Sequence, residues 1–191
     1  MRVIAGLYRR RLLESLPGDQ TRPMLDSMRE TLFNILQTQI EGAVFADLYA
    51  GTGAVGIEAL SRGARQAIFV EANPKALKVI ERNLDKLGAR AQARPMLGRS
   101  HEKVPHIEAD IWFLGPPYAA HEEYEKTLAA LGEKDVKLVI TQHDKRYDPP
   151  LKPGKLERYR VVKMGSNALS FYRPAEQEKP AAEEPAAEAD E

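Results

Sequence analysis

A run of small and apolar residues over positions 44–60 constrains the fold of this chain more than any other stretch. An apolar segment leads into Asp47, a turn with the glycines Gly51 and Gly53 follows, and a helical pattern comes next. This order predicts a strand, a tight turn and the N-terminus of a helix. The two glycines allow the backbone to turn sharply and to approach a ligand closely. We therefore expect the turn to hold a nucleotide.

A carboxylate follows the next expected strand. The apolar segment 67–70 ends at Glu71, twenty residues after Gly51, where an α/β nucleotide site places the acid that holds ribose hydroxyls. Both a nicotinamide dinucleotide and S-adenosylmethionine are compatible with this spacing. Asp47 favours S-adenosylmethionine, because a carboxylate inside the strand can face the cationic end of that cofactor.

The composition fits one domain of moderate size. A chain of 191 residues is long enough to bury a substantial core. It contains no cysteine, which excludes disulfides, thiolate metal sites and a cysteine nucleophile. The histidines form no pattern typical of a metal site, so we expect none. We find neither an apolar run of membrane-spanning length nor the core of a signal peptide, and we expect a soluble cytoplasmic protein.

The net charge of zero hides an uneven distribution of charge. Residues 174–191 carry seven acidic side chains against one lysine, which leaves about +6 on residues 1–173. The tail is rich in Pro, Ala and Glu and is predicted to be disordered. We interpret it as a solubilising extension, with competition against nucleic acid for a basic face as the alternative.

Arginines are concentrated near the N-terminus. Residues 2–13 alternate loosely, and a turn at 17–19 follows them, which predicts a basic β-hairpin or arm ahead of the main sheet. A helix that Asp26 or Ser27 caps explains the next apolar positions. A solvated face would also explain the arginines, but their number favours contact with nucleic-acid phosphates. The residues that we assign to this contact are Arg9, Arg10, Arg11, Arg22 and Arg29.

The remainder of the chain alternates strands and helices and ends in a hairpin. We expect helices over 55–62, 75–87 and 121–131, strands over 90–96, 110–114 and 138–141, and a hairpin of 156–163 and 168–172. This alternation is typical of a mostly parallel sheet with an antiparallel edge. We interpret His143 as a loop residue.

A stiff turn follows the strand expected over 110–114. Two prolines fix their φ angles and remove two donors, so the turn presents carbonyl oxygens to whatever lies above it. The tyrosine after them offers a flat face on which a nucleobase can stack. The four residues of this turn are Gly115, Pro116, Pro117 and Tyr118.

Together these motifs resemble those of the RsmD-type 16S ribosomal RNA guanine-N2 methyltransferases. The similarity covers residues 2 to about 173, and the order of the motifs along the chain makes it specific. The stretches that support it are 2–6 with the arginines after them, 21–23, 29–36, 47–53, 60–64, Glu71, 116–118 and 165–167.

The resemblance implies a fold, a reaction and a set of site residues. The fold is α/β, a Rossmann-like S-adenosylmethionine-dependent methyltransferase with a mostly parallel seven-stranded sheet, an antiparallel edge hairpin and a small basic N-terminal β-arm. We expect the arm at 1–22, the methyltransferase domain at 23–173 and the acidic tail at 174–191. The reaction is transfer of a methyl group to N2 of a guanine in 16S ribosomal RNA, by a monomer acting on an assembling small subunit. The implied cofactor-binding residues are Asp47, Tyr49, Gly51, Thr52, Gly53, Glu71, Ala72, Gly98 and Arg99, and the catalytic loop is Gly115, Pro116, Pro117 and Tyr118.

Two positions depart from the family pattern. Gly115 stands where the family usually has Asp or Asn, and Gly98 stands where it usually has an acid near the adenine. A side chain at position 115 would accept a hydrogen bond from the target amine, and loss of such a contact lowers a rate on the order of a hundredfold. Backbone carbonyls of Gly115 and Pro116 are candidates to replace it.

The departures keep three alternative functions open. The first is a catalytically weak or inactive family member that acts as an RNA-binding or ribosome-assembly factor. The second is a nicotinamide-dependent oxidoreductase, although no hydride-transfer site is recognisable. The third is a DNA-amine methyltransferase, because a Pro-Pro-Tyr loop also suits a flipped adenine or cytosine.

Overall fold

The computed structural model describes residues 1–16 and 24–176. The turn expected at 17–19, Arg22 and residues 177–191 of the acidic tail lie outside the described residues.

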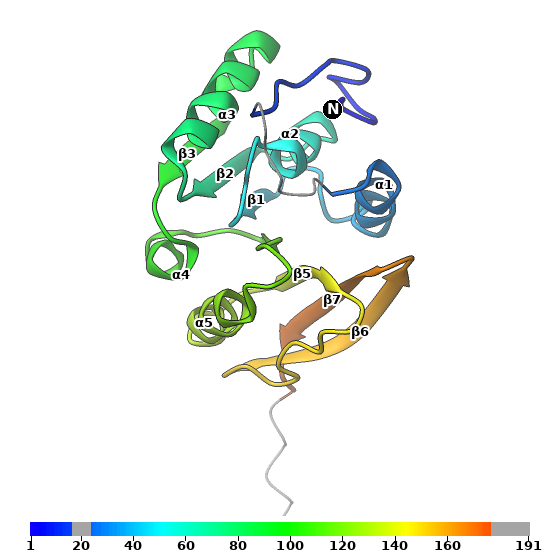
Figure 1. Ribbon diagram of the computed structural model, residues 1–191, viewed down its shortest axis with the longest axis vertical. Helices are drawn as coiled ribbons and strands as arrows, with labels where there is room; N and C mark the ends of the chain where they lie inside the picture. The colour runs from blue at the N-terminus through cyan, green and yellow to red at the C-terminus, as the bar shows by residue number, and fades with distance from the viewer. Residues whose placement is uncertain (17–23, 177–191) are drawn as a thin grey trace, which may run out of the picture.

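A seven-stranded sheet forms the centre of the molecule, with the strand order β3-β2-β1-β4-β5-β7-β6 (Figure 1). Strands β3, β2, β1, β4 and β5 are parallel to their neighbours in this order, and β7 is antiparallel to both β5 and β6. The predicted mostly parallel sheet with an antiparallel edge hairpin is therefore confirmed. The strands are β1 (Val44–Asp47), β2 (Gln66–Glu71), β3 (Ala93–Leu97), β4 (Ile111–Leu114), β5 (Leu138–Asp144), β6 (Leu156–Met164) and β7 (Asn167–Pro174).

Helices cover both faces of this sheet. In Figure 1, α1, α2 and α3 lie on one side of the strands, and α4 and α5 lie on the other. Alternate residues of the strands serve the two faces, since Phe45 and Phe113 pack with α1 and α2, whereas Trp112 and Leu114 pack with α5. The helices are α1 (Asp26–Ile35), α2 (Ala54–Ser61), α3 (Pro74–Leu87), α4 (Ser100–Lys103) and α5 (His121–Gly132), with 3-10 turns at Arg90–Gln92 and Val104–His106.

The ends of α3 show how local sequence sets an element. The side chain of Asn73 accepts a hydrogen bond from the amide of Lys75, Pro74 occupies the first helical position, and Gly88 ends the helix with φ +69°. The start of α1 differs from the prediction. Leu25 precedes the helix and no side chain caps it, and Asp26 instead lies in the first turn.

The N-terminal segment is not a hairpin of the main sheet. A single antiparallel bridge joins Arg2 to Leu12, and the residues between them form turns that pack on α2. Gly6 makes the closest approach, because a Cβ there, at φ +80°, would lie 1.8 Å from the carbonyl oxygen of Ser61. The amide of Leu7 donates to that same oxygen over 2.7 Å. The segment is thus an arm fixed to α2.

Strand β5 extends further than expected. His143 lies within it, is buried and shares a 2.8 Å hydrogen bond with the hydroxyl of Ser170 in β7. Its interpretation as a loop residue is wrong, because pairing with β7 continues the strand beyond the apolar run. None of the helices in the described part of the chain has the length and apolar character that a membrane crossing requires.

Candidate active site

The loops after β1, β2 and β4 meet at one edge of the sheet. Strand β1 lies between β2 and β4, and Asp47 is paired with Phe69 on one side and Phe113 on the other. The chain leaves β1 for α2 on one face of the sheet and β4 for α5 on the other (Figure 1), so the carboxyl ends of these strands form a topological switch point, where open α/β sheets bind ligands. The glycine turn, Glu71 and the Pro-Pro-Tyr loop therefore border the same edge, as the sequence predicts.

The turn after β1 has the backbone that only glycine adopts easily. Gly51 has φ +55° and Gly53 has φ +87°, and Gly53 immediately precedes the first residue of α2. A Cβ at Gly51 would meet no atom within 4 Å, so space is open beside the backbone there. A ligand can therefore approach the turn closely at the N-terminus of α2.

The carboxylate of Glu71 lies against this turn. One of its oxygens accepts from the amide of Gly51 over 2.7 Å, and the other accepts from the amide of Asn73 over 2.8 Å. The side chain is half-buried, and its remaining lone pairs are available to hydroxyl donors. An acceptor beside open backbone space fits the ribose of a nucleoside cofactor such as S-adenosylmethionine.

Asp47 braces the turn from inside. Its side chain is 1% exposed and accepts a 3.0 Å hydrogen bond from the amide of Gly56 in α2. Burial raises the pKa of this carboxyl to about 7, the Gly56 hydrogen bond opposes the shift, and the charge of Glu71 adds to it. In this structure Asp47 positions the turn through Gly56, and its contact with the cofactor stays a prediction.

The aromatic residue of the turn is tied to α5. The hydroxyl of Tyr49 lies 2.6 Å from the hydroxyl of Thr127 and donates over 3.0 Å to the carboxylate of Glu123. The carbonyl of Thr52 accepts from the side-chain amide of Asn83 over 3.1 Å, which anchors the turn to α3. These contacts hold both ends of the predicted cofactor turn.

The loop after β3 reaches the same edge. The amide of Gly98 donates to the carbonyl of Glu71 over 3.0 Å, and the hydroxyl of Ser100 donates to the carbonyl of Leu48. Arg99 is exposed and precedes α4, and Ala72 is exposed beside Glu71. Ser100 and Asn83 are positioning residues that sequence reasoning missed, because a lone Ser or Asn carries no motif.

The carbonyls of the Pro-Pro-Tyr loop are partly used within the protein. The hydroxyl of Tyr124 lies 3.2 Å from the oxygen of Pro116 and 2.8 Å from that of Gln142, and the oxygen of Pro117 accepts from Ala120 over 2.8 Å. The Tyr124 hydroxyl has one proton and lies nearer to the oxygen of Gln142, so the role of the Pro116 carbonyl as an acceptor for the substrate stays a prediction. The loop is rigid because its own oxygens hold it to the following helix.

Tyr118 is fixed by its hydroxyl. The side-chain amide of Gln142 donates to this oxygen over 2.8 Å, and the hydroxyl donates to Oδ1 of Asn167 at the start of β7. The ring is half-buried. Sequence analysis missed Gln142 and Asn167, although Gln142 gives a signal as an amide directly after an apolar strand.

The two departures from the family pattern differ structurally. A Cβ at Gly115 would lie 3.2 Å from the Phe113 ring and 3.8 Å from Oε1 of Gln142, so a side chain there requires only a small shift of the ring. Gly98 has φ +146°, a conformation that other residues rarely adopt. The backbone therefore requires glycine at position 98 but not at position 115.

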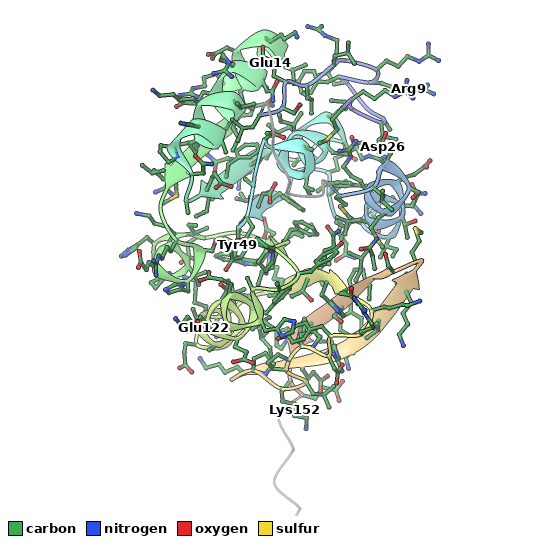
Figure 2. The ribbon with its side chains drawn as sticks, viewed as in Figure 1. Arg9, Glu14, Asp26, Tyr49, Glu122 and Lys152 are labelled. Carbon is green, nitrogen blue, oxygen red and sulfur yellow. The ribbon has the colours of Figure 1, made fainter. Side chains whose placement is uncertain are left out.

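The predicted RNA-binding arginines do not share one environment. Arg9, Arg10 and Arg11 are exposed, and Figure 2 shows Arg9 at the periphery of the molecule. Arg29 is fully buried, lies 3.7 Å from Glu58 and 3.0 Å from Asp26, and donates to the carbonyl of Arg2 over 2.7 Å. Its assignment to a phosphate is wrong, because the N-terminal arm and α1 enclose it.

Comparison with known proteins finds methyltransferases of the same length and fold. YlbH of Bacillus subtilis, described as an rRNA methyltransferase, is 32% identical over 184 residues, 91% of this chain and 98% of that protein. Ribosomal RNA small subunit methyltransferase D of Escherichia coli K12 is 30% identical over 181 residues, 91% and 89% of the two chains. The structure of yhhF from Escherichia coli, described as a methyltransferase, has a TM-score of 0.81 and 29% identity, and covers 93% of this chain and 99% of its own.

The fold, the loops that meet at this sheet edge and these relatives define a Rossmann-like methyltransferase that uses S-adenosylmethionine. This confirms the predicted cofactor class over the nicotinamide alternative. The chain belongs to the family described as Conserved hypothetical protein 95, which matches residues 1–173, and the resemblance to the RsmD-type enzymes is thereby confirmed.

Proposed function

We propose that the protein transfers a methyl group from S-adenosylmethionine to the exocyclic N2 of a guanine in 16S ribosomal RNA. The observation that carries this proposal is the meeting of the Gly51 turn, Glu71 and the Pro-Pro-Tyr loop at one sheet edge. The relatives named as ribosomal RNA small subunit methyltransferases support the choice of substrate. The substrate is the assembling small subunit, and the protein acts as a cytoplasmic monomer.

The chain contributes binding and orientation to this reaction. The bound cofactor supplies a methyl group activated by its sulfonium charge. The turn at Gly51 and Gly53 receives the cofactor, and Glu71 accepts hydrogen bonds from its ribose. The Pro-Pro-Tyr loop supports the guanine, with the ring of Tyr118 as the stacking face.

Orientation is the demanding part of the chemistry, because the lone pair of a guanine amino group is delocalised into the ring. The nitrogen forms the new bond to the methyl carbon while the carbon–sulfur bond breaks, and the electron pair of that bond remains on sulfur. The nitrogen then loses one proton to water. Rigid placement of the base in line with the methyl group lowers the barrier without a strong base.

The arm supplies the electrostatic contact to RNA. The exposed arginines Arg9, Arg10 and Arg11 lie on a segment that is docked on α2 rather than loose. Arg11 donates to the carbonyl of Lys86 over 3.0 Å, so the arm also contacts the end of α3. A docked arm presents its charge to phosphates in a fixed place.

A labelling assay tests the proposal. Purified protein is incubated with labelled S-adenosylmethionine and undermodified small subunits, with fully modified subunits as the matched control, and labelled nucleosides are identified by mass spectrometry. We expect N2-methylguanosine from the undermodified subunits alone, and less label from protein-free 16S RNA. No label in enzyme excess, or label on another base, contradicts the proposal.

Gly115 favours one second candidate, an RNA-binding assembly factor without turnover. Its missing side chain removes an acceptor for the target amine. The same assay separates the two functions, because the factor binds the subunits and the cofactor by calorimetry but transfers no label.

A further inference from the structure

A buried amide lies beside the position where the family pattern has lost its side chain. We propose that Gln142 supplies the hydrogen-bond acceptor for the target amino group that Gly115 lacks. The inference rests on the proposed function and assigns the amine contact to a residue on a neighbouring strand.

The register of the sheet brings the two positions together. Leu114 pairs with Thr141 in the parallel ladder of β4 and β5, so Gly115 and Gln142 are the next positions along the two strands. A Cβ at Gly115 would lie 3.8 Å from Oε1 of Gln142. The amide oxygen therefore borders the space into which an Asp or Asn side chain at position 115 would extend.

Neighbouring hydrogen bonds set the direction of this amide. Its Nε2 donates to the hydroxyl of Tyr118 over 2.8 Å, and that hydroxyl has its own acceptor in Asn167. The main-chain oxygen of Gln142 accepts from Tyr124 over 2.8 Å, which fixes the backbone beneath the side chain. With Nε2 committed to Tyr118, Oε1 is the end of the amide that remains for a ligand.

The environment of Oε1 suits a substrate contact. Gln142 is 6% exposed, and the hydrogen bonds found among the described residues engage its Nε2 and its main chain but not Oε1. An amide oxygen has two lone pairs, so Oε1 can accept a hydrogen bond from a ligand that reaches it. The amino group of a bound guanine offers such a donor.

The arrangement couples stacking to amine placement. The ring of Tyr118 supports the base, and the hydroxyl of the same side chain holds the amide that binds the amine. An amide oxygen does not take up a proton at neutral pH, so Gln142 orients the nitrogen and the proton leaves to water after methyl transfer.

The test compares four variants in the labelling assay. Gln142→Met removes the acceptor at similar volume, and we expect a fall in kcat on the order of a hundredfold with little change in the affinity for S-adenosylhomocysteine. Gln142→Glu keeps an acceptor and retains more activity than Gln142→Met. Adding Gly115→Asn to Gln142→Met raises kcat at least tenfold over Gln142→Met alone, because the acceptor of the family pattern returns. Gly115→Asn in the wild-type background changes kcat by a smaller factor.

Tyr118→Phe separates the amine contact from support of the tyrosine. It breaks the bond to Nε2, so the amide loses part of its orientation but the acceptor Oε1 is still present, and we expect a smaller loss than with Gln142→Met. Failure of Gly115→Asn to restore activity to Gln142→Met shows that Gln142 acts only by holding Tyr118 and overturns the inference. A Gln142→Met enzyme with normal kcat also overturns it while the proposed function stands. If the wild type transfers no label in enzyme excess, the proposed function fails and this inference fails with it. Melting temperature and S-adenosylhomocysteine affinity confirm that each variant is folded.

Discussion

Asp47 is a carboxyl whose pKa rises because the fold encloses it. Burial raises that pKa from 3.8 to about 7, so the folded protein binds a proton more readily than the unfolded chain between these values. Stability contributed by this group is therefore lost as the pH rises through that window.

Asp47→Asn is expected to remove this pH dependence. The Asn oxygen still accepts from the amide of Gly56, so the turn keeps its brace. We expect the variant to gain stability relative to the wild type as the pH rises from 4 to 7, by on the order of 2–4 kcal/mol, with a constant difference above pH 7. Urea unfolding at several pH values measures it, and parallel profiles for the two proteins contradict it.

Arg29 forms a buried ion pair, although its charge and its place in the sequence suggest an RNA contact. The pKa of its guanidinium is lowered by burial, with Glu58 and Asp26 opposing the shift. The carboxylate of Glu58 also accepts from the amides of Ile4 and Ala5 over 2.8 and 3.0 Å. The ion pair therefore joins the arm, α1 and α2, and its function is structural.

Arg29→Met is expected to destabilise the protein by about 2–3 kcal/mol, because the carbonyl of Arg2 and the carboxylate of Asp26 lose a charged donor, while Arg62 at 2.8 Å still compensates Glu58. The salt dependence of RNA binding stays unchanged, since Arg29 reaches no phosphate. Chemical denaturation and filter binding at several salt concentrations measure the two effects. Arg9→Met, at an exposed position, is the control: it is expected to change the salt dependence of RNA binding and to leave the stability unchanged. A changed salt dependence for Arg29→Met contradicts the structural role.

At the scale of elements, the N-terminal arm depends on one close approach. Gly6 has φ +80°, and a Cβ there would overlap the carbonyl of Ser61, whereas Gly42 has φ +73° with no atom within 4 Å of a Cβ. The two glycines share the backbone strain and differ only in the clash.

Gly6→Ala is therefore expected to release the arm from α2. We expect cleavage by trypsin within residues 2–13 to accelerate at least tenfold, because the arginines of the arm become accessible to the protease. Gly42→Ala, the matched control, lowers the stability by about 1 kcal/mol without accelerated cleavage in the arm. Equal cleavage of the two variants means that the contact with Ser61 does not hold the arm.

The sequence predicts those elements whose signals are local. The glycine turn, the distance to Glu71 and the ends of α3 depend on residues close in the chain, and the structure has them where the sequence indicates. The burial of Arg29 and the strand position of His143 depend on packing and pairing with distant segments. The proximity of Gln142 to Gly115 depends on the register of two strands, which no periodicity reveals.

At the scale of the whole molecule, the net charge is divided unevenly between residues 1–173 and the tail. The chain is neutral, yet residues 1–173 carry about +6, and the compensating acids lie in the tail beyond them. Figure 2 shows Arg9 and Lys152 at opposite ends of the molecule, both exposed. Arg9 and Lys152 can therefore be substituted in parallel to test which end of the molecule contacts the RNA.

Arg9→Gln is expected to weaken RNA binding and to lower the slope of log K against log salt by about 0.7–0.9, the contribution of one phosphate contact. Lys152→Gln removes the same charge from the far end, so a long-range effect of net charge would change both variants equally. Filter binding between 50 and 300 mM salt measures the slopes. If the arm contacts the RNA, Arg9→Gln lowers the salt slope and Lys152→Gln leaves it at the wild-type value. A screened charge acts only within about a Debye length of a phosphate, so equal salt slopes for the two variants mean that the RNA does not bind at the arm.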